Sequence, residues 1–161
     1  MMQGLSFAVS ILVSNAFGRK DLKSVREYAR KGYFMTLGIS ATLSVLLYCF
    51  RYQAAGIFSD SPEVTALAVS LFFLLFAYQF GDGLQLCFAN VLRGIQDVKP
   101  IMYAAFVSYY LIAIPSAYLL GFKAGLGIHG IWMGFPIGLT LAGIFFYARY
   151  RSDLRRFGRM M

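Results

Sequence analysis

Five apolar segments constrain the fold more than any other feature of this sequence. They cover residues 2–17, 32–50, 64–92, 101–121 and 128–147. About 20 helical residues cross a hydrocarbon core of about 30 Å, and the last four segments are about that long or longer. Only 14% of the residues are charged, against about a quarter in typical soluble domains. The sequence therefore predicts an all-α integral membrane protein, a single membrane domain over residues 1–161 with five transmembrane helices.

The fifteen Lys and Arg residues divide unevenly between alternate loops. Thirteen lie on one side (six within residues 19–31, five within 149–159, Arg93 and Lys99), and Arg51 and Lys123 lie on the other. Cytoplasmic loops carry such an excess, so the pattern predicts an N-terminus outside and a cytoplasmic C-terminus. Residues 149–161 then form a basic cytoplasmic tail. The net charge of +8 is explained by topology, without nucleic acid as a partner. An odd number of spans and a short first helix favour a chain truncated at its N-terminus.

Rows of small residues at intervals of four predict where helices approach one another closely. The three rows are Ser6, Ser10, Ser14 and Gly18; Gly32, Thr36, Ser40 and Ser44; and Gly130, Gly134, Gly138 and Ala142. A polar pathway along the serines is the alternative to packing for the first two rows. Between those rows, residues 21–31 predict a short amphipathic helix on the inner membrane surface. Its cations either meet anionic lipid headgroups or serve only as a topology signal.

Asp82 is the only acidic residue within an apolar segment. An ionisable group in that position costs about 2.5–3.5 kcal/mol on insertion scales. At 100° per residue, a polar helix face combines Asp82 with Tyr78, Gln79, Gln85 and Asn90. This face must contact protein or water, because lipid would leave its polar groups unsatisfied. It is either a buried polar anchor or a site for a cation.

Motifs for enzymatic chemistry are absent from the sequence. It contains no P-loop, no GxSxG, no HExxH and no paired Cys/His cluster. Asp82 has no second acid within the apolar segments for paired-carboxylate chemistry. The sequence predicts that the protein is not an enzyme and uses no cofactor.

The third segment and the loop after it resemble the signature of the multidrug and toxic compound extrusion (MATE) transporters, in particular their NorM-like branch. The matching positions are Tyr78, Asp82, Gln85, Leu92-Arg93-Gly94, Asp97 and Pro100. Residues 12–19, 58–64 and 130–140 resemble three further stretches of the same family, in the same order. The resemblance covers essentially the whole chain.

This resemblance implies a fold of twelve helices in two six-helix lobes. The chain corresponds to helices eight to twelve, most of the C-terminal lobe, so the N-terminal lobe and the seventh helix are missing partners. The family exports drugs or organic cations against inward movement of Na⁺ or H⁺, here across a bacterial inner membrane. Asp82 is then the cation-binding carboxylate, with Na⁺ as the possible metal there and with Tyr78 and Gln85 at the ion, and a second carboxylate lies on the seventh helix. Gln79 and Asn90, which share the helix face of Asp82, are expected to support the site.

Two alternatives remain open. One is a flippase for lipid-linked sugars from the same superfamily, in which a more cationic cavity is usual. No Lys or Arg lies inside an apolar segment of this chain. The other is a non-transporting membrane fragment or accessory subunit, which the missing seventh helix favours.

Overall fold

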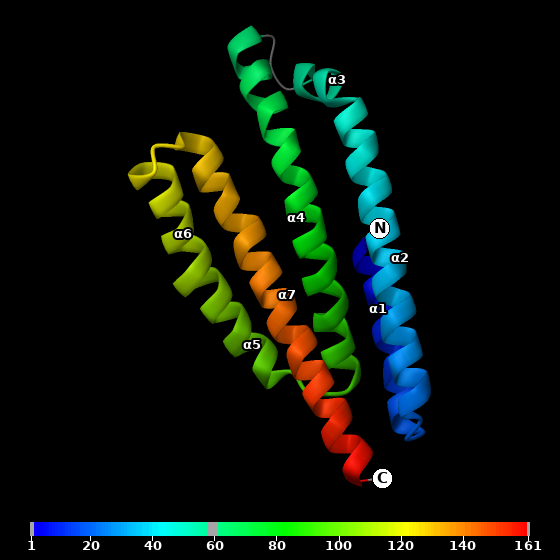
Figure 1. Ribbon diagram of the computed structural model, residues 1–161. Helices are drawn as coiled ribbons and strands as arrows, with labels where there is room; N and C mark the ends of the chain where they lie inside the picture. Colours follow the sequence, from blue (N-terminus) through cyan, green and yellow to red (C-terminus); the bar gives the residue numbers. More distant parts are fainter. Residues whose placement is uncertain (1, 58–60, 161) are drawn as a thin grey trace.

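The fold is helical throughout the part of the chain that the computed structural model describes, residues 2–57 and 61–160 (Figure 1). The elements in chain order are α1 (Met2–Gly18), α2 (Leu22–Cys49), α3 (Arg51–Gly56), α4 (Pro62–Gly94), α5 (Lys99–Phe106), η1 (Val107–Ala113), α6 (Ile114–Tyr118), η2 (Leu119–Lys123) and α7 (Gly127–Met160). The segments η1 and η2 are π-helical, and α5 to η2 follow one another without a break. The predicted all-α class is confirmed for these residues.

Four of the helices are long and apolar enough to cross a membrane. They are Leu22–Cys49, Pro62–Gly94, Lys99–Lys123 and Gly127–Arg159. The remaining predicted span, residues 2–17, corresponds to α1, an apolar helix that is shorter than the other four. Apolar helices therefore lie at all five predicted positions, and four of them have the length of a span.

The segment of residues 21–31 is not a separate helix, so that prediction is wrong. Helix α2 begins at Leu22 and continues to Cys49, with Asp21 as its N-cap. The Asp21 carboxylate accepts hydrogen bonds from the Ser24 backbone nitrogen (3.1 Å) and from Ser24 Oγ (2.6 Å). Val25 and Ala29 are buried in the core. Buried residues at intervals of four and three (Val25, Ala29 and then Gly32) thus run through the basic segment into the rest of α2. The segment therefore packs as the first turns of α2.

Residues 148–160 form the last turns of α7, which continues past the predicted end of the fifth apolar segment. Phe146, Tyr150 and Leu154 are all buried in the core and repeat at intervals of four. The basic residues of this region consequently project from a packed helix.

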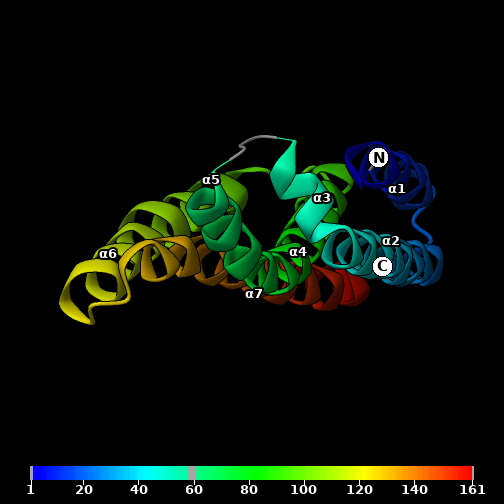
Figure 2. The same ribbon diagram turned by 90° about the horizontal axis from the view of Figure 1, so that it is seen from above.

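Helix α4 is the centre of the packing. Figure 2 shows α1 and α6 on opposite sides of α4 and α7. A Cβ atom added to Gly94 lies 2.8 Å from the Ser10 carbonyl oxygen of α1. One added to Gly143 of α7 lies 2.9 Å from the Gln85 backbone nitrogen of α4. A side chain at either glycine would therefore separate helices that now touch through their backbones.

Two of the three predicted rows of small residues are helix contacts. All four members of the α2 row are buried: Gly32, Thr36, Ser40 and Ser44. The α7 row is also buried and faces the α5–η2 segment. A Cβ atom at Gly134 would lie 2.6 Å from Ala117 Cβ, and one at Gly138 would lie 2.7 Å from Ala113 Cβ. Packing is confirmed for these two rows.

The row predicted for α1 is only partly correct. Ser6 is buried, but Ser14 and Gly18 are exposed. The remaining contact positions belong to Val9, Val13 and Ala16. The buried residues of α1 are therefore spaced by three, four and three positions instead of by four throughout. This spacing keeps one face of α1 against both α2 and α4.

The Gly134→Leu variant should be less stable by about 1–3 kcal/mol, because the new side chain overlaps α6 and forces the helices apart. Thermal unfolding of the protein in detergent micelles measures the loss. Gly38→Leu is the matched control, since Gly38 is exposed on α2 and a Cβ atom added there would have nothing within 4 Å. Equal melting temperatures for the two variants would contradict the role of the α7 row.

Candidate functional site

Asp82 lies within α4, about 18 Å along the helix axis from Gly94. The glycines on either side of it are buried against two different helices. A Cβ atom at Gly81 would lie 2.8 Å from Thr140 Oγ1 of α7, and one at Gly83 would lie 3.4 Å from Ser40 Oγ of α2. These contacts cover two sides of α4 and leave Asp82 partly exposed on the remaining face.

Two tyrosine side chains lie near the Asp82 carboxylate. Tyr78 lies one helical turn before Asp82 and is within electrostatic reach of it. Tyr109, from the π-helical segment η1, is within reach of both Asp82 and Tyr78 and interacts with the Gln85 side chain. The structure thus brings together three predicted site residues, Asp82, Tyr78 and Gln85, and adds Tyr109 from another helix.

The Asp82 carboxylate makes no hydrogen bond or ion pair with residues 2–57 or 61–160. Within the same ranges, no three His, Cys, Asp or Glu side chains group together to hold a metal ion. A charged carboxylate in an apolar helix requires a compensating cation, a proton or a polar partner. The lone pairs of Asp82 are available to a ligand, and the side chains of Tyr78 and Tyr109 lie within electrostatic reach of it.

Gln79 and Asn90 share the helix face of Asp82, but neither forms a hydrogen bond with its carboxylate in the described structure. Gln79 is partly exposed. Asn90 is buried, donates from Nδ2 to the Leu86 carbonyl oxygen (2.9 Å), and accepts at Oδ1 from Arg93 Nη1 (3.2 Å). Asn90 thus contributes to the end of α4 near Gly94, about 12 Å from Asp82 along the axis.

Tyr109 is the neighbour that the sequence did not reveal. A helical-wheel projection of the third apolar segment identifies only residues that share a face of that helix. Tyr109 belongs to a different helix. The fourth apolar segment holds Tyr103, Tyr109, Tyr110 and Tyr118 without a pattern that distinguishes one of them. The one local signal is the π-helical winding of η1, which is frequent at functional positions.

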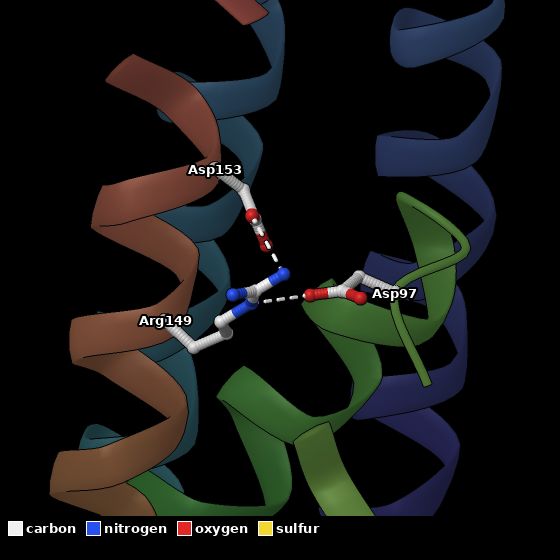
Figure 3. Close-up of polar contacts among 3 residues, drawn as sticks. All are labelled: Asp97, Arg149 and Asp153. Atoms are coloured by element: carbon white, nitrogen blue, oxygen red, sulfur yellow. Dashed lines mark hydrogen bonds and ion pairs between the residues drawn. The ribbon is translucent and has the colours of Figure 1, made fainter. Parts of the chain in front are cut away.

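A second polar cluster joins the loop after α4 to the last turns of α7 (Figure 3). Arg149 Nε lies 2.6 Å from Asp97 Oδ2, and Arg149 Nη2 lies 3.3 Å from Asp153 Oδ1. Asp153 is buried, and its Oδ2 atom has no hydrogen-bond partner among the described residues. One guanidinium therefore bridges two carboxylates and holds the loop against α7.

The charge of Asp97 in the loop is stabilised by this arrangement. Burial acts to raise the pKa of Asp97, but the hydrogen bond and the positive charge of Arg149 outweigh it and hold that pKa below its ordinary value. Because the pKa of Asp97 is lower in the folded state, its ionised carboxylate contributes its full stabilisation at pH values above the unfolded-state pKa of about 3.9. It is lost as the pH falls through the lower folded-state pKa.

The long apolar helices of the described residues, with the Asp82 carboxylate inside one of the apolar segments, are those of a helical multi-pass membrane protein. The chain belongs to the MatE family, whose family model matches residues 1–119. The resemblance drawn from the residues around Asp82 is therefore confirmed.

Relatives that carry names agree with the assignment of the chain to this family. The chain is 37% identical over 149 residues to the multidrug resistance protein NorM of Aliivibrio fischeri, an alignment that covers 90% of this chain and 32% of NorM. It is 34% identical over 152 residues to the multidrug resistance protein MdtK of Photorhabdus laumondii, covering 90% of this chain and 33% of MdtK. The chain spans about a third of the length of these relatives.

Solved structures share the fold. The eukaryotic MATE transporter AtDTX14 superposes with a TM-score of 0.85 at 24% identity, covering 99% of this chain and 37% of AtDTX14. An inward-facing multidrug resistance MATE family transporter of the MOP superfamily superposes with a TM-score of 0.89 at 16% identity, covering 98% of this chain and 37% of that protein. The helix arrangement is thus that of one part of a larger MATE structure.

The Arg149→Gln variant should be less stable by about 1–3 kcal/mol, because it leaves the buried Asp153 carboxylate without its cation. The double variant Arg149→Gln/Asp153→Asn should recover part of this loss, since no charge then remains buried. Thermal unfolding in detergent measures both. The control is Lys31→Gln, which removes an exposed ion pair with Glu27 (2.6 Å) and should cost below about 1 kcal/mol. A double variant less stable than Arg149→Gln would contradict the bridging role.

Proposed function

We propose that this chain is part of the C-terminal lobe of an antiporter that exports drugs or organic cations in exchange for Na⁺ or H⁺. The observation that carries the proposal is the partnerless Asp82 carboxylate, placed among Tyr78, Gln85 and Tyr109 within an apolar helix. The relatives named multidrug resistance proteins support the export of drugs. Transport, rather than catalysis, agrees with the absence of enzymatic motifs from the sequence.

Asp82 couples ion binding to the state of the transporter in this proposal. The ionised carboxylate is costly in an apolar environment, and a bound Na⁺ ion or proton neutralises it. The Gln85 oxygen supplies a further ligand, and the rings of Tyr78 and Tyr109 offer their negative faces to a cation. An ion that binds one access state more tightly than the other shifts the equilibrium toward that state.

The other parts of the proposed antiporter lie outside this chain. The second carboxylate of the ion site comes from the seventh helix, and the N-terminal lobe supplies the other wall of the substrate cavity. The distribution of positive charge supports an N-terminal end outside and a C-terminus in the cytoplasm. The bacterial relatives support the inner membrane as the location.

A chimera tests this proposal. In it, the present chain replaces the matching third of Aliivibrio fischeri NorM, and drug efflux is followed by ethidium accumulation in cells and by uptake into vesicles with an imposed Na⁺ or pH gradient. Asp82→Asn should lower gradient-driven efflux at least tenfold, because the amide neither binds Na⁺ strongly nor exchanges a proton. Asp82→Glu should retain part of the activity.

Glu63→Gln provides the matched control, since it removes a carboxylate from the first turn of the same helix, away from the site. Its efflux should equal that of the unmodified chimera. All variants are compared at equal membrane expression and with the same elution from a sizing column. Unchanged efflux and unchanged ion dependence in Asp82→Asn would show that Asp82 is a structural anchor instead.

A further inference from the structure

A groove of about 640 Å³ lies between the beginning of α2 and the last turns of α7, with α4 as its floor. These two ends lie near one another at the bottom of Figure 1. On α4 the groove is lined by Leu84 and Phe88, which lie on the opposite side of the helix from Asp82. The groove is therefore distinct from the candidate ion site.

Four arginines line one end of this groove. Arg26 and Arg30 belong to α2, and Arg151 and Arg155 belong to α7. All four are exposed, and the ion pairs of the described residues involve none of them. No carboxylate lines the groove, and the nearby Glu27 and Asp153 form ion pairs with Lys31 and Arg149. Two helices thus place four arginines, none of them in an ion pair of the described residues, around one space.

The deeper part of the groove is aromatic. The Phe88 ring lies 5.6 Å from the Tyr33 ring, 4.9 Å from the Tyr147 ring and 5.5 Å from the Tyr150 ring, between centroids. Tyr147 also has the Arg151 guanidinium carbon 5.9 Å from its ring centroid. The rings come from three helices and pack on a buried residue, which gives the groove a firm apolar floor.

The change from cationic to apolar lining coincides with the ends of the apolar segments. Arg26 and Arg30 precede the second apolar segment, which begins at residue 32, and Arg151 and Arg155 follow the fifth, which ends at residue 147. These positions predict that the arginines lie at the depth of lipid headgroups, and that Tyr33, Phe34 and Tyr147 lie at the depth of the first acyl carbons.

We propose that this groove binds an anionic phospholipid, with its phosphate among the four arginines and its acyl chains along the aromatic floor. Guanidinium groups match phosphate oxygens with paired hydrogen bonds, and basic pockets between membrane helices suit acidic headgroups. A free phosphate ion would use only the cationic end and leave the apolar floor uncovered. The lipid covers both parts of the groove, and its binding depends on neither the coupling ion nor the exported substrate.

Lipid titration of the purified protein in neutral detergent tests this site. Phosphatidylglycerol, phosphatidylcholine and glycerol 3-phosphate are added separately, and bound lipid is counted by native mass spectrometry while the melting temperature is recorded. Phosphatidylglycerol should remain bound and raise the melting temperature. Phosphatidylcholine should bind at least tenfold more weakly for lack of net charge, and so should glycerol 3-phosphate for lack of acyl chains.

The double variant Arg26→Gln/Arg151→Gln removes one cation from each wall of the groove. At about 1 kcal/mol for each cation, it should bind phosphatidylglycerol roughly 30-fold more weakly. The matched control is Arg19→Gln/Lys23→Gln, which removes two exposed cations from the same end of the molecule but outside the groove. Its lipid affinity should change less than threefold.

Three results would overturn the proposal. Equal binding of phosphatidylcholine would show that charge does not select the ligand. Binding of glycerol 3-phosphate as tight as that of phosphatidylglycerol would assign the groove to a free phosphate compound. An equal loss of affinity in the groove variant and in the control would show a diffuse surface attraction without a built site.

Discussion

The close approach of helix backbones is the constraint on which the rest of this structure depends. Apolar side chains gain little from leaving lipid for one another, so membrane helices associate through short-range dispersion and interhelical hydrogen bonds. Gly94 lets α1 touch α4, and Gly143 lets α7 touch it on another side. Gly81 and Gly83 repeat this arrangement around Asp82 itself. Because glycines bring neighbours against two sides of α4, one polar side remains for a ligand.

Charged residues at the ends of the helices have unlike roles because their surroundings differ. Arg149 is engaged by two carboxylates and holds the loop after α4 against α7. Arg151, two residues further along the same helix, points to another side and lines the groove with Arg26 of α2. In the count of positive charges, Arg149 and Arg151 contribute equally to the predicted topology. Only the geometry separates a structural bridge from cations that are available to a phosphate.

The candidate site was predictable to the extent that it lies on one helix. Asp82, Tyr78 and Gln85 follow from the helical period, since residues three or four apart share a face. The same period also selected Asn90, whose amide is bound instead to Leu86 and Arg93. Tyr109 was not predictable, because its approach to Asp82 depends on how the η1 segment packs on α7, which in turn packs on α4. The helical period gives the direction of each side chain around its own helix axis. It carries no information on which other helix packs against that face.

The sequence by itself determined the helical class, the positions of five apolar helices, the packing rows of α2 and α7, and the singular carboxylate of α4. These features follow from local composition and from a fixed rise and rotation per residue. Tertiary structure decided that residues 22–31 continue α2, that residues 148–160 continue α7, and that Val9 and Val13 replace Ser14 and Gly18 in the contacts of α1. It also decided the Asp97–Arg149–Asp153 bridge and the arginine groove. Each of these depends on the relative rotation and depth of separate helices, which contacts far apart in the chain establish together.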